Sequence, residues 1–408
     1  MNAKLAVAAP WSLTHYIPLN GFHPLYRALF EAKPEWVEIA AWDNIELSQT
    51  LRGEPGFRGQ LLKELARDAN VFASSAGPVE KGYFNHFSEA NLSLTRLLPG
   101  DIEFHHTAPF PSFERPFVFH CEAFAPLFFP LAHQGSGGFG NLDVQEVRNH
   151  YRAIFEHPLC LGLFSHIPQT LAEIRQFFAS PLIDSKLHPS RIGLFGSDSL
   201  PPQVAKGALQ APLFLFVNSA NQNPNNFVLR GGHIALRYWQ RIYPEPGAGR
   251  LIMRCARPMD NELAKCGVDL AWLQRHEGRS VIWIENFLSE TELDSLMQAA
   301  HFLLLPSMSL HSVSIMSAMA AGAVPIVSDT VGTDRYVLDA VDGVVLRGIL
   351  ATNWRHDKAT GLMFNCFERS VALEDDLVEQ LVQRLGSLLA DPQAYAALQQ
   401  AAVAKART

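Results

Sequence analysis

Two short segments of the 408-residue sequence carry groups that could hold an anion or the hydroxyls of a sugar. The first, residues 218–232 (NSANQNPNNFVLRGG), is an asparagine-rich turn that ends with Arg230 and Gly231 directly before a helical pattern. A guanidinium charge, helix N–H groups and a backbone without a side chain together suit a diphosphate. The sequence therefore predicts an anion site at Arg230. A surface arginine beside a polar turn is the alternative interpretation.

The second segment, residues 303–346, reads as a buried strand, a polar turn, a helix of small residues and a second buried strand. Its turn carries four hydroxyl or imidazole groups before the helix, on Ser307, Ser309, His311 and Ser312. A strand that delivers such a turn to a helix N-terminus forms a seat for a phosphate or for sugar hydroxyls. An ordinary strand–helix–strand unit without a ligand has the same pattern, so the pattern alone leaves both interpretations open.

A third candidate group ends the apolar run Phe117–His120, where His120 is followed by Cys121 and Glu122. Ligands of doubly wound sheets gather at the carboxyl ends of the strands, which is where such a histidine would lie. It could donate a hydrogen bond to a bound ligand or stabilise charge that develops on that ligand. Glu122 is the alternative polar group at this point, and a purely structural histidine is the alternative role.

Strands and helices must alternate along the chain to position these groups. In the first half the predicted strands are residues 5–9, 37–41, 71–74, 102–105, 117–120 and 161–165. In the second half they are residues 214–217, 250–254, 281–285, 303–305 and 324–327. Helical patterns lie between them, and one helix, at 290–300, begins with a capping box formed by Ser289 and Glu292. This alternation predicts an α/β protein with doubly wound parallel sheets.

The chain length and a Gly- and Pro-rich stretch at residues 193–212 predict two domains. We expect an N-terminal Rossmann-like domain over residues 1–195 and a linker over 196–212. A second Rossmann-like domain is expected over 213–385, followed by a helical tail over 386–408. The glycine cluster at 135–140 lacks a preceding strand, so we interpret it as a lid or hinge loop.

The run from Pro306 to Asp329, with the motif AMAAGAVPIVSD, resembles the donor-site segment of family 4 glycosyltransferases and their GT-B relatives. The resemblance implies the GT-B architecture, in which two Rossmann-like domains face one another across a cleft. In that family one glutamate contacts the transferred sugar, and a second glutamate holds the ribose of the donor. Ser309 and Ser317 occupy those two positions here, so both carboxylates are replaced.

The same resemblance implies the remaining site residues. Arg230 and Gly231 match a Lys-Gly pair that grips the donor diphosphate, and Ser219 stands where the family has an upstream arginine. His120, with Glu122 as the alternative, matches a histidine that faces the transferred sugar. The full set of implied donor-binding residues is Gly21, Ser219, Arg230, Gly231, Asn286, Ser309, His311, Ser312, Val313 and Ser317.

The resemblance implies a hexosyltransferase of polysaccharide biosynthesis that uses a nucleotide-sugar donor. It also implies that the enzyme requires no metal and no other cofactor. The acceptor would be a glycan, a lipid-linked molecule or a protein, and the reaction would retain the anomeric configuration. Because Ser309 and Ser317 replace the carboxylates, two alternatives stay open. One is a non-catalytic GT-B subunit that binds a nucleotide or a glycan, and the other is a sugar-nucleotide epimerase.

Composition excludes several classes of protein. The chain has 33 basic and 40 acidic residues, a net charge of −7, and no dense basic cluster, which argues against nucleic-acid binding. Its five cysteines form no CxxC pair, which is typical of reduced thiols and predicts a cytoplasmic protein. No apolar run reaches the roughly 18 residues of a membrane span, while peripheral membrane association stays open. The sixteen histidines form no metal-binding motif.

Overall fold

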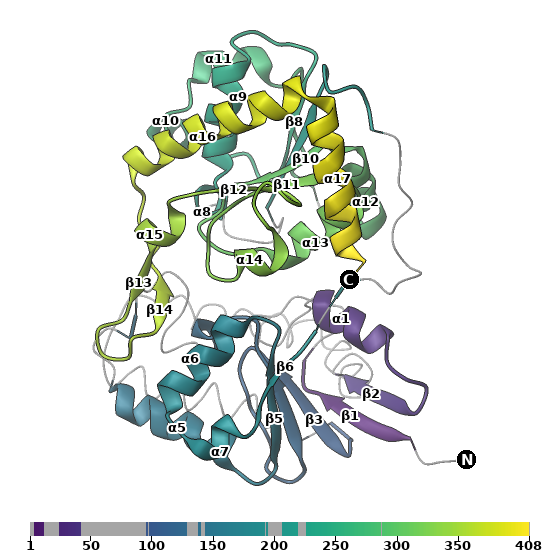
Figure 1. Ribbon diagram of the computed structural model, residues 1–408, viewed down its shortest axis with the longest axis vertical. Helices are drawn as coiled ribbons and strands as arrows, with labels where there is room; N and C mark the ends of the chain where they lie inside the picture. Colours follow the sequence, from purple (N-terminus) through teal and green to yellow (C-terminus); the bar gives the residue numbers. More distant parts are fainter. Residues whose placement is uncertain are drawn as a thin grey trace, which may run out of the picture. The chain divides into compact units, whose positions relative to one another are not determined.

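The structure, a computed structural model, describes residues 4–11, 24–41, 95–96, 98–128, 138–139, 143–191, 193–194, 206–218, 226–286 and 288–407. The chain divides into two compact units. Unit 1 comprises Met1–Gly193 together with Arg355–Cys366, and unit 2 comprises Leu194–Trp354 together with Phe367–Thr408. Both units are α/β, with one parallel sheet each, as the sequence predicts (Figure 1).

Unit 1 contains a six-stranded sheet in the order β2-β1-β3-β4-β5-β6, and all its neighbouring strands are parallel. The strands are β1 (Leu5–Ala9), β2 (Val37–Ala41), β3 (Ile102–His106), β4 (Phe117–His120), β5 (Cys160–Ser165) and β6 (Leu187–Pro189). The helices are α1 (Pro24–Glu31), α5 (Val144–Glu156), α6 (Pro168–Phe178) and α7 (Pro181–Asp184), with a 3-10 turn at Ala125–Phe128.

The core of unit 1 is aromatic. Phe119 and Phe155 are buried beside Phe124, Phe128 and Phe177, which pack mostly edge to face. A short hairpin completes this core from far along the sequence. Its strands are β13 (Trp354–His356) and β14 (Met363–Asn365), and it contributes Leu362 and Phe364. Burial of such rings supplies most of the favourable free energy of packing.

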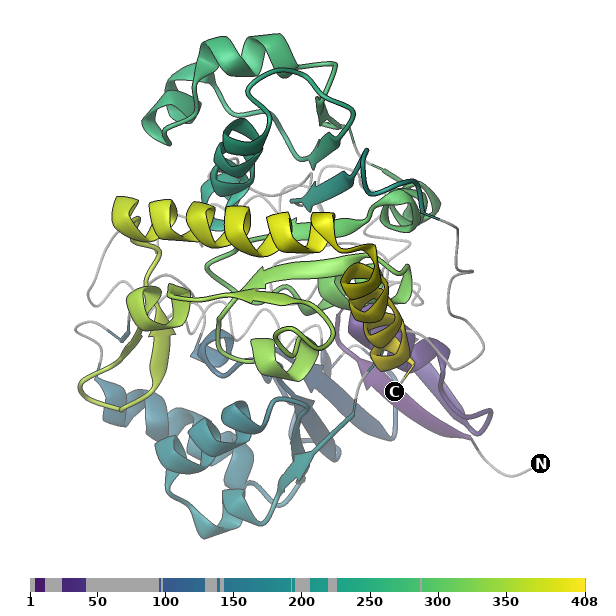
Figure 2. The same ribbon diagram turned by 45° about the horizontal axis from the view of Figure 1, so that its top comes forward.

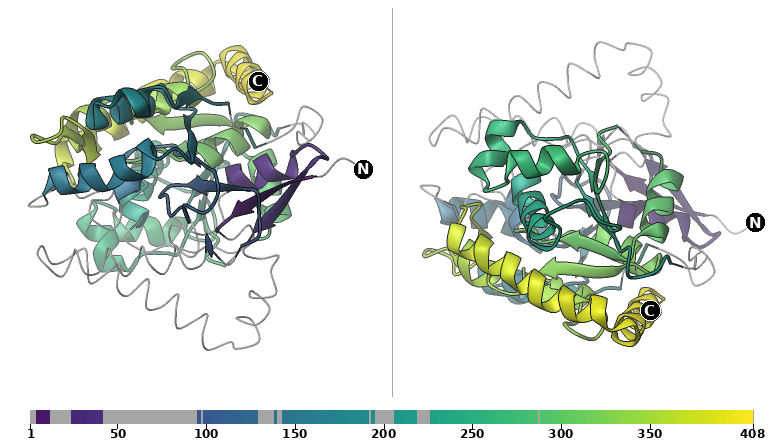
Figure 3. Two further views of the ribbon diagram at one scale, coloured as in Figure 1. Left: turned by 90° about the horizontal axis from the view of Figure 1, so that it is seen from below. Right: turned by 90° about the horizontal axis from the view of Figure 1, so that it is seen from above.

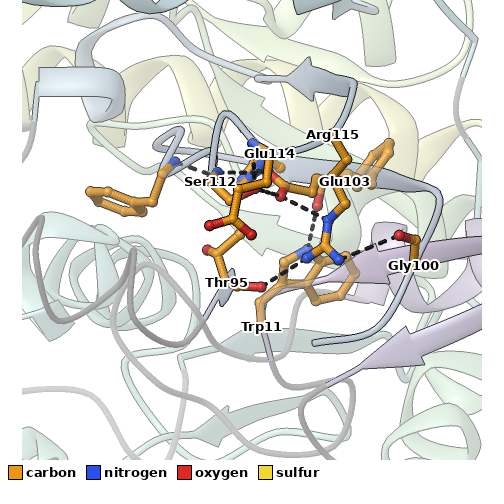
Figure 4. Close-up of polar contacts among 10 residues, drawn as sticks. Trp11, Thr95, Gly100, Glu103, Ser112, Glu114 and Arg115 are labelled. Atoms are coloured by element: carbon orange, nitrogen blue, oxygen red, sulfur yellow. Dashed lines mark hydrogen bonds and ion pairs between the residues drawn. The ribbon is translucent and has the colours of Figure 1, made fainter. Parts of the chain in front are cut away.

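A buried carboxylate fixes the connection between β3 and β4. Glu103 is fully buried in β3 and accepts hydrogen bonds from the side chains of Arg115 (2.9 Å), Ser112 and His105 (2.9 Å) (Figure 4). Arg115 also donates to the carbonyl oxygen of Thr95 at 2.9 Å. Although burial acts to raise it, these hydrogen bonds hold the pKa of Glu103 below its ordinary value. The network therefore holds an ionised glutamate and sets the position of β3.

Unit 2 contains a second parallel sheet of six strands, in the order β12-β11-β10-β7-β8-β9. The strands are β7 (Leu213–Val217), β8 (Arg250–Arg254), β9 (Val281–Trp283), β10 (Phe302–Leu305), β11 (Val324–Ser328) and β12 (Val344–Leu346). Every residue of β10 and β11 is buried, as expected for central parallel strands that are covered on both faces.

The helices of unit 2 cover this sheet. They are α8 (Asn226–Leu229), α9 (Gly232–Ile242), α10 (Asp260–Lys265), α11 (Leu270–His276), α12 (Glu290–Ala299), α13 (Ser312–Ala320), α14 (Thr333–Tyr336), α15 (Ile349–Asn353), α16 (Val371–Ala390) and α17 (Pro392–Ala406). The two C-terminal helices, yellow in Figure 2 and Figure 3, belong to this unit: α16 packs against α9, and α17 packs against α13.

Lys206 ties two of these helices together. Its ammonium group donates to the carbonyl oxygens of Gln298 (2.6 Å) and Met297 (3.3 Å) at the end of α12. It also donates to the carbonyl oxygen of Ala321 (3.0 Å), directly after α13. The last carbonyl groups of a helix receive no hydrogen bond from within it. A cation at the helix C-terminus can bond to them and also complements the helix dipole. Lys206 therefore fixes α13 by its far end.

Most predicted elements match the observed ones within two residues, including β1, β2, β4 and β8 at both ends. The capping box of α12 is confirmed: Ser289 Oγ accepts from the N–H of Glu292, and Glu292 accepts from the N–H of Ser289. The predicted helix of small residues is α13, which begins at Ser312, directly after the polar turn. The predicted strand at 71–74 and most of the glycine cluster at 135–140 lie outside the described residues.

Candidate functional site

The candidate donor site lies at the carboxyl ends of β7 and β10. These two strands are neighbours in the sheet of unit 2, and the chain leaves them in opposite directions, with β8 and β9 on one side and β11 and β12 on the other. Such a point of reversal is the place where open parallel sheets bind ligands. Helix α9 follows β7 and helix α13 follows β10, so two helix N-termini belong to this edge.

Gly231 locks the two segments together. It has the left-handed conformation (φ 77°, ψ 23°) as the residue that caps α9. A Cβ atom at this position would lie 2.1 Å from the carbonyl oxygen of Pro306, so only glycine fits. Next to this contact, the N–H of Met308 donates to the carbonyl oxygen of Leu229 at 2.9 Å. The structure thus brings the predicted Arg230–Gly231 pair and the predicted polar turn to one place.

Hydrogen bonds order the polar turn itself. Ser307 Oγ lies 2.8 Å from His311 Nε2, and Ser309 Oγ lies 3.3 Å from the same nitrogen. Ser307 Oγ also accepts from the N–H of Ser309 at 3.2 Å. His311 caps α13 without a side-chain hydrogen bond to the helix. The first N–H groups of a helix have no acceptor within it, and those of Ser312 and Val313 therefore suit an external anion.

The electrostatics of this turn favour an anion over a cation. Burial, and then the positive charge of Arg230, hold the pKa of His311 well below its ordinary value. The imidazole of His311 is therefore neutral near pH 7 and can both donate and accept a hydrogen bond. Arg230, half-buried at the end of α8, stays charged at any physiological pH. The turn thus combines one fixed positive charge with neutral hydroxyl and imidazole groups.

The remaining described residues of the predicted donor set lie in α13 and after β9. Ser312 is buried and Val313 is half-buried in the first turn of α13, and Ser317 is half-buried further along the same helix. Asn286 is exposed after β9, which is separated from β10 in the sheet by β7 and β8. Gly21 and Ser219 lie outside the described residues.

Sequence reasoning missed a buried pair beside this site. Asn218, directly after β7, and Arg254, the last residue of β8, are 5% and 8% exposed. Arg254 Nη1 donates to the carbonyl oxygen of Asn218 at 2.6 Å, and the N–H of Asn218 donates to the carbonyl oxygen of Arg254 at 2.9 Å. A charged residue that ends an apolar strand was the available signal, because buried arginines are rare unless they are paired.

The candidate catalytic residues belong to a second cluster, in unit 1. Tyr26 Oη lies 2.7 Å from His120 Nδ1, and His120 Nε2 lies 3.3 Å from His166 Nδ1. His166 Nε2 in turn lies 3.4 Å from Glu122 Oε1. The two imidazole rings are stacked, with their centroids 5.3 Å apart. The structure therefore brings His120 and Glu122 together through His166, in one chain of polar contacts.

The protons in this series of polar contacts can be assigned without conflict. Burial, and then the charge of Glu122, raise the pKa of Tyr26 well above its ordinary value, so its hydroxyl keeps its proton. Tyr26 can then donate to His120, and His120 to His166, while the nitrogen of His166 that faces Glu122 carries a hydrogen. Both ring nitrogens of His120 thus have partners within the protein. A ligand that bonds to His120 must replace one of them.

Tyr26 and His166 are functional candidates that the sequence patterns did not indicate. His166 follows β5 as His120 ends β4, and these strands are neighbours in the sheet, so the common position of the two histidines was a usable signal. Tyr26 belongs to α1 and reaches His120 only through the tertiary fold. His106, at the end of β3, stacks on the ring of Tyr26 at 4.3 Å between centroids.

Within the described ranges, no three His, Cys, Asp or Glu side chains are grouped as metal ligands would be. In the same part of the chain, no helix has both the length and the apolar character to cross a membrane. A hollow of about 850 Å³ in unit 2, lined by residues 206–210 and α17, contains none of the predicted site residues.

Comparison with known proteins gives a fold. No protein-family model and no curated protein sequence matches the chain. HepE from Anabaena, solved with UDP, superposes with a TM-score of 0.54 at 10% identity, over 99% of this chain and 94% of that one. WaaG, a glycosyltransferase involved in lipopolysaccharide biosynthesis, gives a TM-score of 0.52 at 13% identity, over 99% and 95% of the two chains. A glycosyltransferase from Rickettsia africae gives 0.51 at 11%, over 100% and 94%. The likeness is one of architecture: the chain has the GT-B fold.

Proposed function

We propose that this protein is a glycosyltransferase that moves a hexose from a nucleotide-sugar donor to a glycan, lipid-linked or protein acceptor. One observation carries the proposal: the Arg230–Gly231 pair is fixed on the polar turn after β10, beside the N-termini of α9 and α13. That arrangement offers the charge and the N–H groups that a diphosphate requires. The similar HepE was solved with UDP and with UDP-glucose, which supports a nucleotide sugar as the ligand class.

In this proposal the residues of unit 2 hold the donor. The diphosphate contacts Arg230 and the N–H groups of Ser312 and Val313, and Gly231 allows the backbone to approach it. Ser309 and His311 bond to hydroxyls of the sugar. Ser317 takes the position of the ribose contact, and the backbone at Asn286 takes that of the nucleobase contact. Gly21 and Ser219 complete the proposed set.

The proposed chemistry depends on charge at the leaving group. The bond between the anomeric carbon and the diphosphate oxygen breaks, and negative charge grows on that oxygen. Arg230 and the positive end of α13 stabilise this charge, so we propose that the reaction needs no metal. We propose His120 as the residue that faces the transferred sugar, with Glu122 as the alternative, and we assign the acceptor to the N-terminal domain. Retention of configuration is part of the proposal.

Loss of the two carboxylates has a predictable cost in affinity. A carboxylate that accepts hydrogen bonds from two ribose hydroxyls contributes about 1.5–3 kcal/mol for each charged bond, whereas Ser317 offers one neutral bond. Donor affinity should therefore be roughly ten- to a hundred-fold weaker than with a glutamate at this position. We propose a cytoplasmic enzyme of polysaccharide biosynthesis, in contact with membranes at most peripherally.

A ligand screen tests the donor site. Thermal unfolding is measured with UDP, GDP, ADP and the corresponding nucleotide sugars, on the wild-type protein and on Arg230→Ala. A nucleotide that raises the unfolding temperature of the wild type, and that loses most of this effect in Arg230→Ala, supports the proposal. Arg241→Ala, an exposed arginine on α9, is the matched control. No response of the wild type to any of these ligands would remove the donor site.

The replaced carboxylates favour a second candidate, a GT-B subunit that binds a nucleotide or glycan without catalysis. Ser309 and Ser317 are its basis, since neither can carry the charge of a glutamate. Incubation with a nucleotide sugar separates the candidates. Release of nucleoside diphosphate supports the transferase, and binding without any release supports the subunit. Conversion of the donor into a different nucleotide sugar, with no acceptor present, would indicate an epimerase instead.

A further inference from the structure

Among the described residues, Arg254 is a buried cation without a buried anionic partner. Its side chain is 8% exposed, and its only hydrogen bond within the described part of the chain runs from Nη1 to the carbonyl oxygen of Asn218. Its Nε–H is buried and has no partner among those residues. No carboxylate of the described ranges forms an ion pair with it. A buried guanidinium normally has an acidic partner, because removal of its charge from water is costly.

The position of Arg254 suggests the missing partner. Arg254 ends β8, and β8 is the neighbour of β7, so its guanidinium group lies at the carboxyl edge where the candidate donor site begins. It reaches across to the backbone of Asn218, the first residue after β7. Asn218 is 5% exposed, and its side-chain oxygen also has no hydrogen-bond partner within the described residues. Two adjacent polar side chains at this edge thus have hydrogen-bonding atoms without a partner in the described part of the chain.

We propose that Arg254 is a second cationic contact of the donor diphosphate, and that Asn218 is its polar neighbour in that site. The inference deepens the proposed function and rests on it. The family resemblance implies an arginine directly after the strand that corresponds to β7, where this chain has Ser219. Here the guanidinium group comes from the adjacent strand and reaches the carbonyl oxygen of the residue that precedes Ser219.

The chemistry of the two arginines is complementary. A diphosphate carries several charged oxygens, and one arginine can neutralise only part of that charge. Arg230 approaches from the start of α9, and Arg254 approaches from the end of β8. The planar guanidinium of Arg254 keeps Nε–H available for a phosphate oxygen while Nη1 holds the protein backbone. A lysine has no second donor at a fixed angle, so it would restore charge but not geometry.

Three variants test the assignment. Arg254→Met removes the charge with little change in volume, and Arg254→Lys keeps the charge. Arg250→Met is the matched control, because Arg250 is exposed at the opposite end of the same strand. Affinities are measured by calorimetry for UDP, GDP and ADP, for the nucleosides uridine, guanosine and adenosine, and for inorganic pyrophosphate. Thermal unfolding of each variant monitors the fold.

The expected pattern is specific to phosphate. Arg254→Met should weaken binding of the diphosphate and of pyrophosphate at least tenfold, and leave nucleoside affinity within twofold of the wild type. Arg254→Lys should recover part of the loss, and Arg250→Met should bind as the wild type does. Equal loss for nucleoside and diphosphate would indicate a structural role and overturn the proposal, as would an unchanged diphosphate affinity. If the wild type binds neither a nucleoside diphosphate nor pyrophosphate, the proposed function itself fails.

A fourth variant keeps the test valid if Arg254→Met does not fold. Asn218→Asp puts a carboxylate on the residue that Arg254 already contacts, so it gives the buried guanidinium an internal partner. We expect this variant to unfold at the same or a higher temperature than the wild type and to lose at least tenfold in diphosphate affinity. Undiminished diphosphate binding by a folded Asn218→Asp protein would overturn the proposal.

Discussion

Gly231 and Pro306 meet through their backbones, so closely that a Cβ atom on Gly231 would lie 2.1 Å from the carbonyl oxygen of Pro306. This contact joins the loop that carries Arg230 to the turn that carries Ser307 and His311. The two segments are about 75 positions apart in the sequence, yet neither can shift without the other. The geometry of the candidate donor site therefore depends on the absence of one methyl group.

The first prediction is that Gly231→Ala destabilises the protein and weakens nucleotide binding. The alanine would have to keep φ at 77°, which costs about 1–2 kcal/mol, and its Cβ would push the turn at Pro306 away. Thermal unfolding and nucleotide titration measure both effects. Gly386→Ala is the control with the opposite sign, because Gly386 lies within α16 and a Cβ there meets nothing within 4 Å. That change should stabilise by about 0.5–1 kcal/mol. Equal stability of the two variants would contradict the prediction.

The second prediction concerns acid stability through Glu374. This carboxylate accepts two hydrogen bonds of 2.7 Å from Arg369 and lies 3.2 Å from His233 Nε2. Although burial acts to raise it, these partners lower the pKa of Glu374 to about 2. Because the folded-state pKa is below that of the unfolded chain, the ion pair stabilises the protein above about pH 4.5. This stability is lost as the pH falls from about 4.5 towards 2.

Glu374→Gln tests this expectation. We expect a loss of about 3 kcal/mol at pH 7, because Arg369 and His233 lose their buried partner, and a much smaller further loss between pH 4.5 and 3 than in the wild type. Unfolding temperatures at several pH values give the comparison. Glu379→Gln, on the exposed side of the same helix, should change neither the stability nor its pH dependence. If the stability of Glu374→Gln fell between pH 4.5 and 3 as steeply as that of the wild type, Glu374 would not be the source of the acid sensitivity.

The third prediction has the opposite sign. Burial raises the pKa of Glu173 on α6 to about 7, against a hydrogen bond of 3.3 Å from Gln169. The folded chain then holds a proton that the unfolded chain releases, so stability should fall as the pH rises from about 4.5 to 7. Glu173→Gln mimics the protonated form. It should raise stability at pH 8 by about 2 kcal/mol and leave it unchanged at pH 4.5, where the carboxyl group is already neutral. A gain of equal size at both pH values would argue against this titration.

The fourth prediction concerns turnover. His120→Ala should reduce the release of nucleoside diphosphate from the donor by about 100-fold or more, within the range for loss of an acid–base group. Tyr26→Phe removes only the hydroxyl that contacts His120 Nδ1 and should cost about tenfold, as expected for one hydrogen bond. His188→Ala is the control, since His188 is an exposed histidine on β6 of the same sheet. Unchanged turnover in a folded His120→Ala protein would remove this residue from catalysis.

The sequence predicts local structure well where the causes are local. The capping box of Ser289 and Glu292 needs only four consecutive residues, and the buried strands need only their own apolar runs. The proximity of Arg230 to the polar turn at Ser307 could be predicted only because the family resemblance implies how these elements are arranged. No pattern could place Tyr26 against His120, since that contact joins α1 to β4 through the tertiary fold.

The contact between Arg254 and Asn218 could not be predicted from the sequence either. The strand of Arg254 reads as an ordinary apolar run, and the sequence alone does not say which strand will be its neighbour. The observed sheet order puts β8 next to β7, and only then does the guanidinium group reach the backbone of Asn218. Side chains at strand ends acquire partners from the order of the strands, which is a property of the whole sheet.

The hairpin at Arg355–Cys366 has a practical consequence for anyone who wishes to dissect this protein. A gene fragment that ends at residue 193 would encode a first unit without Leu362 and Phe364, and would leave open the place where the ring of Phe364 meets that of Phe139 at 5.2 Å. Such a fragment should aggregate. A spliced chain, in which residues 355–366 follow residue 193 through a flexible peptide, would restore the missing rings and is the smallest version of that half that we expect to be soluble.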